Sequence, residues 1–518
     1  MPHGKFVSNG NLRIFNNMTT KITNYIRAAY PALYIVSAEE QRVESQLKVV
    51  SASIGYDLHY WTPLAGLVNI ATGACANAAD PLEALDAISE APEKSVFILK
   101  DFHLYLDAAN PNPVLVRKLK DLFVAAKATS KTIVMLACRV VLPPELEREI
   151  TVLDFSLPGK EQMGAVLDGI MKSAQLSAME PNHRAKVLEA TKGLTTIEAE
   201  NAMALSVVEA QAVTPKIVAR EKAQALRKGG ILEVVETCVD LDAVGGMDVL
   251  KSWLVNRQQA FTYRAVAYGL PCPKGLLILG IPGTGKSLTA KATASVFGVP
   301  LLRLDAGKLF GSLVGQSEGN LRSAIATAEA ISPCVLWIDE IEKGFAGSKS
   351  SGSSDGGTSA RVFGSFLNWM QEKASMVFVI ATANDISQLP PELLRKGRFD
   401  EIFFVDLPSQ KEREQIWRIQ IIKYGRKPED FDTAQLSRIT DGLTGSEIEA
   451  VFSEALYSAF ANNREPTDLN IAECLNEFTS LAQTMAEAIK SLRTWARGRA
   501  RLATKPEAPA QGRKLATA

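Results

Sequence analysis

An eight-residue stretch constrains this chain more than any other part of its sequence. It consists of Gly280, Ile281, Pro282, Gly283, Thr284, Gly285, Lys286 and Ser287. An apolar run of strand length, residues 275–279, precedes it, and a helical pattern begins at Leu288. A strand, a glycine-rich turn ending in Lys-Ser and a helix, in this order, predict a phosphate-binding loop rather than a chance glycine-rich turn.

The residue types in this loop suit the binding of a nucleoside triphosphate. Glycines let backbone N–H groups point at one anion, and the N-terminus of the following helix adds positive potential. We expect Lys286 to reach the β- and γ-phosphates and the Ser287 hydroxyl to hold Mg²⁺.

Length and composition narrow the class of protein. At 518 residues the chain is too long for one core, so we expect two or more domains. Lys+Arg and Asp+Glu are equal at 57 each, which argues against a surface for nucleic acid or an acidic membrane.

No CxxC pair and no HExxH occur, which argues against a zinc site and excludes a fused zinc protease. A polar N-terminus and no bilayer-spanning apolar run predict a soluble, cytoplasmic protein without a membrane partner.

The first 230 residues repeat the pattern of the rest of the chain. Strands predicted at 31–37, 95–101 and 131–137 alternate with helical stretches, which indicates a parallel α/β sheet. Three short segments then recur in the same order, so we interpret the first half as a second copy of the C-terminal module. They are 142–146, 152–158 and 193–199 in the first half, and 389–393, 404–408 and 442–450 in the second.

The first copy lacks phosphate-binding chemistry. Where the loop should follow its first strand, residues 37–40 read Ser-Ala-Glu-Glu, with neither glycine nor lysine, and two carboxylates would repel a phosphate. Asp101 ends a strand without a second acid beside it, so we expect a capping or solvent-facing role rather than a metal ligand. This half is therefore interpreted as a non-hydrolysing scaffold or partner-binding domain.

Two further strands of the second copy end in polar residues. Residues 334–338 deliver Asp339 and Glu340 at the carboxyl end of a strand, the edge at which such sheets bind ligands. We expect Asp339 to hold Mg²⁺ through water and Glu340 to polarise the water that attacks the γ-phosphate. The strand at 376–383 is followed by Asn384, whose amide can hydrogen-bond the γ-phosphate or that water.

Arg395 and Arg398 flank Gly397 shortly after that strand. A guanidinium fork suits the spread negative charge of phosphoryl transfer. A surface-exposed basic turn is the alternative interpretation.

Together these motifs resemble those of the AAA ATPases. They read Gly-Ile-Pro-Gly-Thr-Gly-Lys-Ser, Trp-Ile-Asp-Glu-Ile-Glu, Ala-Thr-Ala-Asn and Leu-Leu-Arg-Lys-Gly-Arg-Phe-Asp. Within residues 238–480 they are similar to the subfamily of proteasomal, membrane-fusion and microtubule-severing ATPases. The layout, a degenerate half before one AAA module, resembles a group encoded in chloroplast and cyanobacterial genomes, with bacterial and phage relatives.

The resemblance implies a P-loop, three-layer parallel-sheet module with a C-terminal helical lid, which binds ATP and Mg²⁺ and assembles as a homo-hexameric ring. It implies catalytic roles for Glu340, Asn384, Arg395 and Arg398, with both arginines acting on the neighbouring subunit's nucleotide. Further nucleotide contacts implied by the resemblance are Asp242, Val244 and Gly245 at the adenine, Leu288 after the phosphate loop, and Gly445 and Ser446 in the lid.

These inferences divide the chain into six expected parts. They are a flexible leader at 1–20, a degenerate ATPase-like α/β domain at 21–158, a helical lid-like part and connector at 159–230, the AAA large domain at 231–408, a helical lid at 409–492 and a basic disordered tail at 493–518. The connector is expected to be a charged helical stretch that runs from 200 to 235 and breaks at Gly229-Gly230.

One departure from the family concerns the first pore loop. Family members that thread polypeptides carry an aromatic, an aliphatic and a glycine there, whereas this chain has Leu313, Val314 and Gly315. Leucine lacks the large flat face of an aromatic ring, so threading is in doubt although ring assembly is not. Residues 347–357, rich in Gly and Ser, fall at the second pore loop and are expected to be a flexible loop.

Three functions are compatible with these features. The first is ATP-driven remodelling of an unknown protein partner, with the inert first half as scaffold or adaptor. The second is a nucleic-acid motor or loader, for which the basic tail is the sole support. The third is a nucleotide-switched regulatory scaffold with little turnover. The chloroplast stroma is the alternative location if the gene is plastid-encoded.

Overall fold

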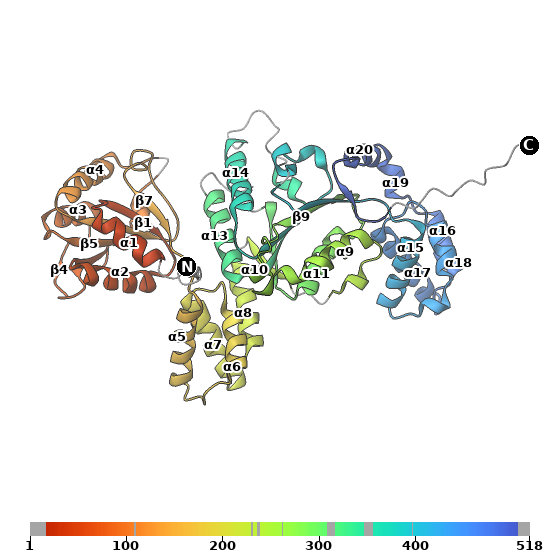
Figure 1. The fold of residues 1–518 in the computed structure, drawn as a ribbon, viewed down its shortest axis with the longest axis horizontal. Helices are drawn as coiled ribbons and strands as arrows, with labels where there is room; N and C mark the ends of the chain where they lie inside the picture. The colour runs from red at the N-terminus through yellow and green to blue at the C-terminus, as the bar shows by residue number, and fades with distance from the viewer. Residues whose placement is uncertain are drawn as a thin grey trace, which may run out of the picture. The chain divides into compact units, whose positions relative to one another are not determined.

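The computed structural model describes residues 17–107, 110–228, 231–235, 239–261, 263–307, 316–345, 356–395 and 397–505. The chain divides into two compact units, whose ribbons are drawn in Figure 1. The first unit comprises Met1–Lys172 with Thr195–Asn201, and the second comprises Ser173–Leu194 with Ala202–Ala518.

The first unit is built around a sheet with helices on both faces. Its strands are β1 (Ala32–Val36), β2 (Asp57–Thr62), β3 (Gly66–Asn69), β4 (Cys75–Ala76), β5 (Ser95–Lys100), β6 (Thr132–Ala137) and β7 (Thr151–Asp154). Its helices are α1 (Asn17–Arg27), α2 (Glu40–Ile54), α3 (Pro81–Glu90), the 3₁₀ turn η1 (Phe102–Tyr105), α4 (Pro113–Ala128) and α5 (Lys160–Ser173). Helices α1 and α2 pack on one face of the sheet and α3 and α4 on the other.

The second unit contains the phosphate loop. Its strands are β8 (Leu232–Val235), β9 (Gly275–Gly280), β10 (Leu301–Leu304), β11 (Cys334–Ile338), β12 (Val377–Ala383), β13 (Glu401–Val405) and β14 (Arg501–Leu502). The helices around this sheet are α9 (Asp248–Arg257), α10 (Tyr263–Tyr268), α11 (Lys286–Phe297), α13 (Gln316–Ile331), η4 (Ile341–Phe345), α14 (Gly356–Glu372) and α20 (Ala486–Ala496).

Two groups of helices accompany that sheet. The C-terminal lid is made of α15 (Gln410–Lys423), α16 (Thr433–Ile439), α17 (Gly445–Ala461) and α18 (Asp468–Asn476), followed by α19 (Leu481–Thr484). The earlier group is α6 (Pro181–Thr191), α7 (Thr196–Ala210) and α8 (Pro215–Lys228), of which α7 begins in the first unit and ends in the second.

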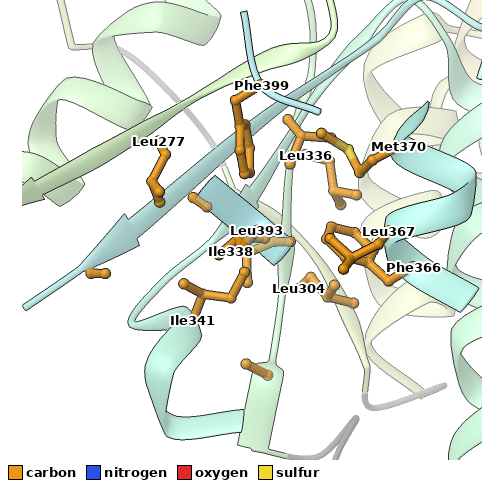
Figure 2. Packing of buried hydrophobic residues seen from close by; sticks show 14 of the residues in the cluster. Leu277, Leu304, Leu336, Ile338, Ile341, Phe366, Leu367, Met370, Leu393 and Phe399 are labelled. Atoms are coloured by element: carbon orange, nitrogen blue, oxygen red, sulfur yellow. The ribbon is translucent and has the colours of Figure 1, made fainter. Parts of the chain in front are cut away.

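Apolar strands buried on both faces explain why this sheet forms. Leu277, Leu336 and Ile338 face one side and belong to one buried cluster with Phe366 and Met370 of α14 (Figure 2). The alternate residues of the same strands pack against α9 and α11 on the opposite side. Near-continuous apolar runs are typical of strands in a parallel sheet with helices on each face.

The two sheets share one topology. Among the described residues, each is seven-stranded, and the orders are β4-β3-β2-β5-β6-β1-β7 and β14-β13-β9-β12-β11-β10-β8. The strands β7-β1-β6-β5-β2 therefore match β13-β9-β12-β11-β10, and each series ends on an antiparallel neighbour, β3 or β8. Asp101 and Glu340 follow matching strands with φ of 53° and 48°, and each precedes a 3₁₀ turn. The predicted fold class, a P-loop α/β module with a C-terminal helical lid preceded by a degenerate copy of the same fold, is confirmed.

Three boundaries differ from expectation. Residues 17–20 belong to α1 rather than to a loose leader, and residues 232–235 form β8 rather than a helical connector. Residues 493–505 are ordered: α20 buries Ile489 and Ala496, and Ala503 N–H donates to the Phe404 carbonyl at 2.9 Å. The arginine-rich composition concealed this apolar helix face, and a two-residue strand such as β14 depends on its pairing with β13 rather than on local propensity.

Several expectations concern residues that the structure does not describe. The leader up to residue 16, the first pore loop with Leu313, Val314 and Gly315, residues 347–355 and the tail from 506 all lie outside the described ranges. In the part of the chain that is described, no helix is both long and apolar enough to cross a membrane.

Candidate nucleotide site

The phosphate loop lies between β9 and α11. Gly280 ends the buried strand, and α11 begins at Lys286, so the loop N–H groups and the helix N-terminus converge on one place. Gly283 and Gly285 adopt left-handed φ of 78° and 90°, which glycine reaches without steric cost. The sequence therefore folds locally into an anion cradle.

Lys286 lies inside this loop with only 6% of its surface exposed. Its Nζ donates to the carbonyl oxygens of Gly280, at 2.9 Å, and Ile281, at 2.7 Å. Burial lowers the pKa of Lys286 to about 8, while the nearby carboxylates of Glu342, Asp339 and Glu340 act in the opposite direction. The ammonium is thus held in position by the backbone and still charged near neutral pH.

Ser287 and Asp339 meet at the end of the loop. The Ser287 hydroxyl donates to Asp339 Oδ1 at 3.1 Å, and the Thr382 hydroxyl donates to the same oxygen at 2.6 Å. Mg²⁺ prefers oxygen ligands and is commonly held by one or two protein groups together with phosphates and water. A hydroxyl and a carboxylate held this close beside a phosphate cradle fit that ion.

Three contacts hold Glu340 at the edge of the cavity. Its backbone, in the left-handed region, donates through N–H to the Thr382 hydroxyl at 3.0 Å, and its Oε1 accepts from Asn384 Nδ2 at 3.0 Å. Its carboxylate also forms an ion pair with Lys343. A non-glycine residue held in this conformation is typical of functional sites, where the surrounding contacts offset the strain.

Thr382 and Glu342 position these groups, and sequence reasoning missed both. Glu342 is 5% exposed and accepts the Asn384 backbone N–H at 2.9 Å, while burial raises the pKa of its carboxyl. Both residues lie two positions from a predicted site residue, Glu342 after Glu340 and Thr382 before Asn384. This spacing from a predicted site residue is the feature of the sequence that could have identified them.

A cavity of about 910 Å³ opens above the loop. It brings together most of the predicted residues: Asp242, Val244, Gly245, Pro282, Gly283, Thr284, Gly285, Lys286, Ser287, Leu288, Asp339, Glu340, Asn384, Gly445 and Ser446. Lining residues that were not predicted are Val239, Ala243, Thr382, Ile416, Ile419, Gln420, Ile422, Lys423 and Glu449. Most of these belong to α15, so the lid supplies one wall of the cavity.

The lid contacts the phosphate loop directly. Ser446 N–H, in the first turn of α17, donates to the Gly283 carbonyl at 3.1 Å. A Cβ on Gly283 would lie 2.1 Å from Ser446 Oγ, and a Cβ on Gly245 would lie 2.5 Å from Cγ1 of Ile416 in α15. Glycine at position 283 therefore lets the phosphate loop lie close to α17, and glycine at position 245 lets residues 242–245 lie close to α15.

The remaining predicted residues lie outside the cavity lining. Gly280 and Ile281 contribute through their carbonyls to Lys286. Arg395 is exposed, and its N–H donates to the Glu392 carbonyl at 3.3 Å. The Arg398 guanidinium donates to that same carbonyl. Neither arginine lines the cavity of its own chain.

Comparison with known proteins agrees with this geometry. Residues 276–407 match the ATPase family associated with various cellular activities (AAA), residues 18–155 match the N-terminal domain of SpoVK-like AAA ATPases, and residues 161–229 match the second domain of those proteins.

The similarity to two algal proteins covers nearly the whole chain. The "Uncharacterized AAA domain-containing protein ycf46" of Guillardia theta is 40% identical over 501 residues, covering 95% of this chain and 97% of that protein. The ycf46 protein of Pyropia yezoensis is 39% identical, covering 94% and 99%. The Cell division cycle protein 48 homolog of Archaeoglobus fulgidus is 30% identical over 264 residues, 49% of this chain and 35% of its own. The chain therefore belongs to the AAA family and is an ATP-hydrolysing enzyme.

Proposed function

We propose that this ATPase couples Mg²⁺-dependent hydrolysis to movement of its lid and so remodels a protein partner, with the first half as scaffold or adaptor. The observation that carries the proposal is the 3.1 Å hydrogen bond from Ser446 N–H to the Gly283 carbonyl. It joins the lid helix α17 to the loop that would hold the phosphates. A change at the γ-phosphate would therefore act on the lid through one peptide contact.

The side chains divide the chemistry among them. Lys286 and the loop N–H groups bind the phosphates, and Asp242, Val244 and Gly245 contact the adenine. Ser287 and Asp339 hold Mg²⁺, which neutralises charge on the phosphates when it is bound. Glu340 accepts the proton of the attacking water, and Asn384 orients that water or the γ-phosphate.

We further propose a homo-oligomeric ring, a hexamer, in which Arg395 and Arg398 complete the neighbouring subunit's site. AAA proteins typically form such rings, and both arginines lie away from the cavity of their own chain. A guanidinium supplied in trans contributes roughly 10³–10⁵ in rate in related phosphoryl transfers. The protein would act in the cytoplasm, or in the stroma if it is plastid-encoded.

The experiment compares ATPase rates alone, with an unfolded protein and with single-stranded DNA at two salt concentrations. Stimulation by protein supports remodelling, whereas stimulation by DNA alone, falling steeply with salt, would identify a nucleic-acid motor. Hydrogen exchange of residues 444–450 with ATP and with ADP tests the coupling, and Lys286→Ala serves as the control without nucleotide. Different exchange in the two nucleotides together with negligible turnover would favour the nucleotide-switched scaffold, and equal exchange would contradict the coupling between nucleotide and lid.

Trapping Glu340→Gln with ATP then identifies the partner. A protein that co-purifies in ATP but not in ADP is the expected result, and co-purification independent of nucleotide would argue against remodelling.

A further inference from the structure

Glu39 is a buried carboxylate where the first copy has lost its phosphate loop. It follows β1 and is the N-cap of α2, as the phosphate loop follows β9 and leads into α11. Only 4% of its surface is exposed. In the second copy the matching place contains glycines, Lys286 and Ser287, so the first copy presents an anion where the second presents an anion-binding site.

The groups around Glu39 are those that would bind a phosphate. Its Oε1 accepts two hydrogen bonds from Thr196, one from the backbone N–H at 2.6 Å and one from the hydroxyl at 2.7 Å. Its Oε2 accepts from the Arg42 guanidinium at 2.5 Å. Backbone N–H at a helix start, a hydroxyl and a guanidinium are common ligands of anions.

Thr196 is the lid residue that matches Gly445. Thr195 and Glu198 exchange hydrogen bonds at the start of α7, as Thr444 and Glu447 do at the start of α17. Because both helices begin with this capping pair, Thr195 aligns with Thr444 and Thr196 aligns with Gly445. In the second copy the N–H of Ser446, one residue after Gly445, bonds to the Gly283 carbonyl, and in the first copy the N–H of Thr196 bonds to the Glu39 carboxylate.

Arg42 extends the contact to the rest of the first copy. Its guanidinium lies 4.4 Å from the centre of the Phe155 ring, donates to Gln162 Oε1 of α5 at 3.3 Å and donates to the Ser156 carbonyl. The pair Glu39–Arg42 thereby joins α2, the chain after β7, α5 and the start of α7. A buried ion pair is weak evidence for stability by itself, but it is well suited to specify one arrangement.

We propose, independently of the remodelling activity, that Glu39 is a built-in substitute for a nucleotide phosphate. It holds the start of α7 against the core of the first copy in one closed arrangement, whatever nucleotide the second copy binds. The start of α7 is then held to the first copy permanently, without a ligand whose loss would release it.

Hydrogen exchange on the full chain tests this proposal in the peptide covering residues 195–201. Glu39→Ala should speed exchange there at least tenfold, and Thr196→Val should do so to a smaller extent. Glu44→Ala is the matched control, because Glu44 lies on the same helix and pairs with Lys100 at 2.8 Å away from α7. ATP should leave this peptide unchanged in the unmodified protein.

Inorganic phosphate provides the second arm. In Glu39→Ala, millimolar phosphate should slow exchange of residues 195–201 again, since Arg42 and Thr196 remain to bind it, and should have no effect in Glu44→Ala. Unchanged exchange in Glu39→Ala, no recovery with phosphate, or closure that requires ATP would each overturn the proposal. If Glu39→Ala does not fold, Thr196→Val decides: faster exchange supports the role of Glu39, and unchanged exchange contradicts it.

Discussion

Asn384 holds Glu340 through a 3.0 Å hydrogen bond from Nδ2 to Oε1. The two residues follow β12 and β11, neighbouring parallel strands in which Ile338 pairs with Ala381. The carboxyl ends of parallel strands meet at one edge of a sheet, so the topology brings together two side chains 44 residues apart. The same bond gives Asn384 control over the orientation of the carboxylate that is proposed to accept a proton.

Thr382→Val should impair hydrolysis more than nucleotide binding. The Thr382 hydroxyl donates to the Asp339 carboxylate and accepts the Glu340 backbone N–H, so valine removes one of the two hydroxyl donors to Asp339 and one of the contacts that hold the Glu340 backbone. We expect turnover and Mg²⁺ affinity to fall about 10–100-fold, the usual effect of losing a group that orients a metal ligand. Turnover measured against Mg²⁺ concentration checks this, with Thr382→Ser as the matched control that keeps the hydroxyl. If turnover of the Val variant depended on Mg²⁺ concentration as turnover of the Ser variant does, Thr382 would not have this orienting role.

Nucleotide binding should be linked to proton uptake above pH 8. Burial lowers the pKa of Lys286 from 10.5 to about 8, so the free protein loses this charge as the pH rises through 8. Bound phosphates favour the charged form and raise that pKa, so ATP affinity should fall as the pH rises above 8, and ATP binding at such a pH should take up protons. Calorimetry at pH 8.5 in buffers of different ionisation enthalpy measures the uptake.

Lys286→Arg is the control for this linkage, because arginine stays charged throughout that pH range. Its residual ATP binding should take up no proton. Lys222 and Lys373 also have a pKa lowered to about 8 but do not line the cavity, so they should not contribute. An uptake that persists in Lys286→Arg would assign the proton to another group.

Gly283→Ala should separate the lid from the phosphate loop. The new Cβ would lie 2.1 Å from Ser446 Oγ, on a residue whose φ is +78°. We expect a loss of about 1–3 kcal/mol in unfolding free energy, the range for such backbone strain, and weaker ATP binding. Adding Ser446→Gly should recover only the steric part. Thermal unfolding and ATP titration of both variants check this, and an unaffected single variant would contradict the close loop–lid contact.

Arg398→Ala should reduce hydrolysis by roughly 10³-fold in the assembled ring and leave ATP binding intact. Mixing with Lys286→Ala subunits should restore part of the activity, because these subunits cannot bind ATP yet still supply Arg398. The measurement is the ATPase rate against the mixing ratio, beside the mass of the assembly. A fully active monomer would contradict the action in trans.

Local motifs made the meeting of the candidate site residues at one cavity predictable. An apolar strand precedes the phosphate loop, the pair Asp339 and Glu340, and Asn384. One short segment therefore predicts both a buried strand and the polar groups that follow it. The repeat of short segments likewise revealed the second copy of the fold.

The lid wall of the cavity was harder to predict. Ile416, Ile419, Gln420 and Lys423 lie on one face of α15, but a face that mixes apolar and polar residues resembles an ordinary surface. The Glu39–Thr196 contact joins residues 157 positions apart, and nothing local in the sequence indicates it. Both features arise from tertiary packing rather than from local pattern.

Glu340 is proposed to activate water in a cavity that still binds ATP when this carboxylate is absent. The most direct measurement compares ATP affinity and turnover in Glu340→Gln, which keeps the size of the side chain and an oxygen able to accept from Asn384. We expect ATP affinity to stay within a few-fold of that of the unmodified protein and turnover to fall by about 10²–10⁴. Unchanged turnover, or loss of ATP binding along with turnover, would contradict it.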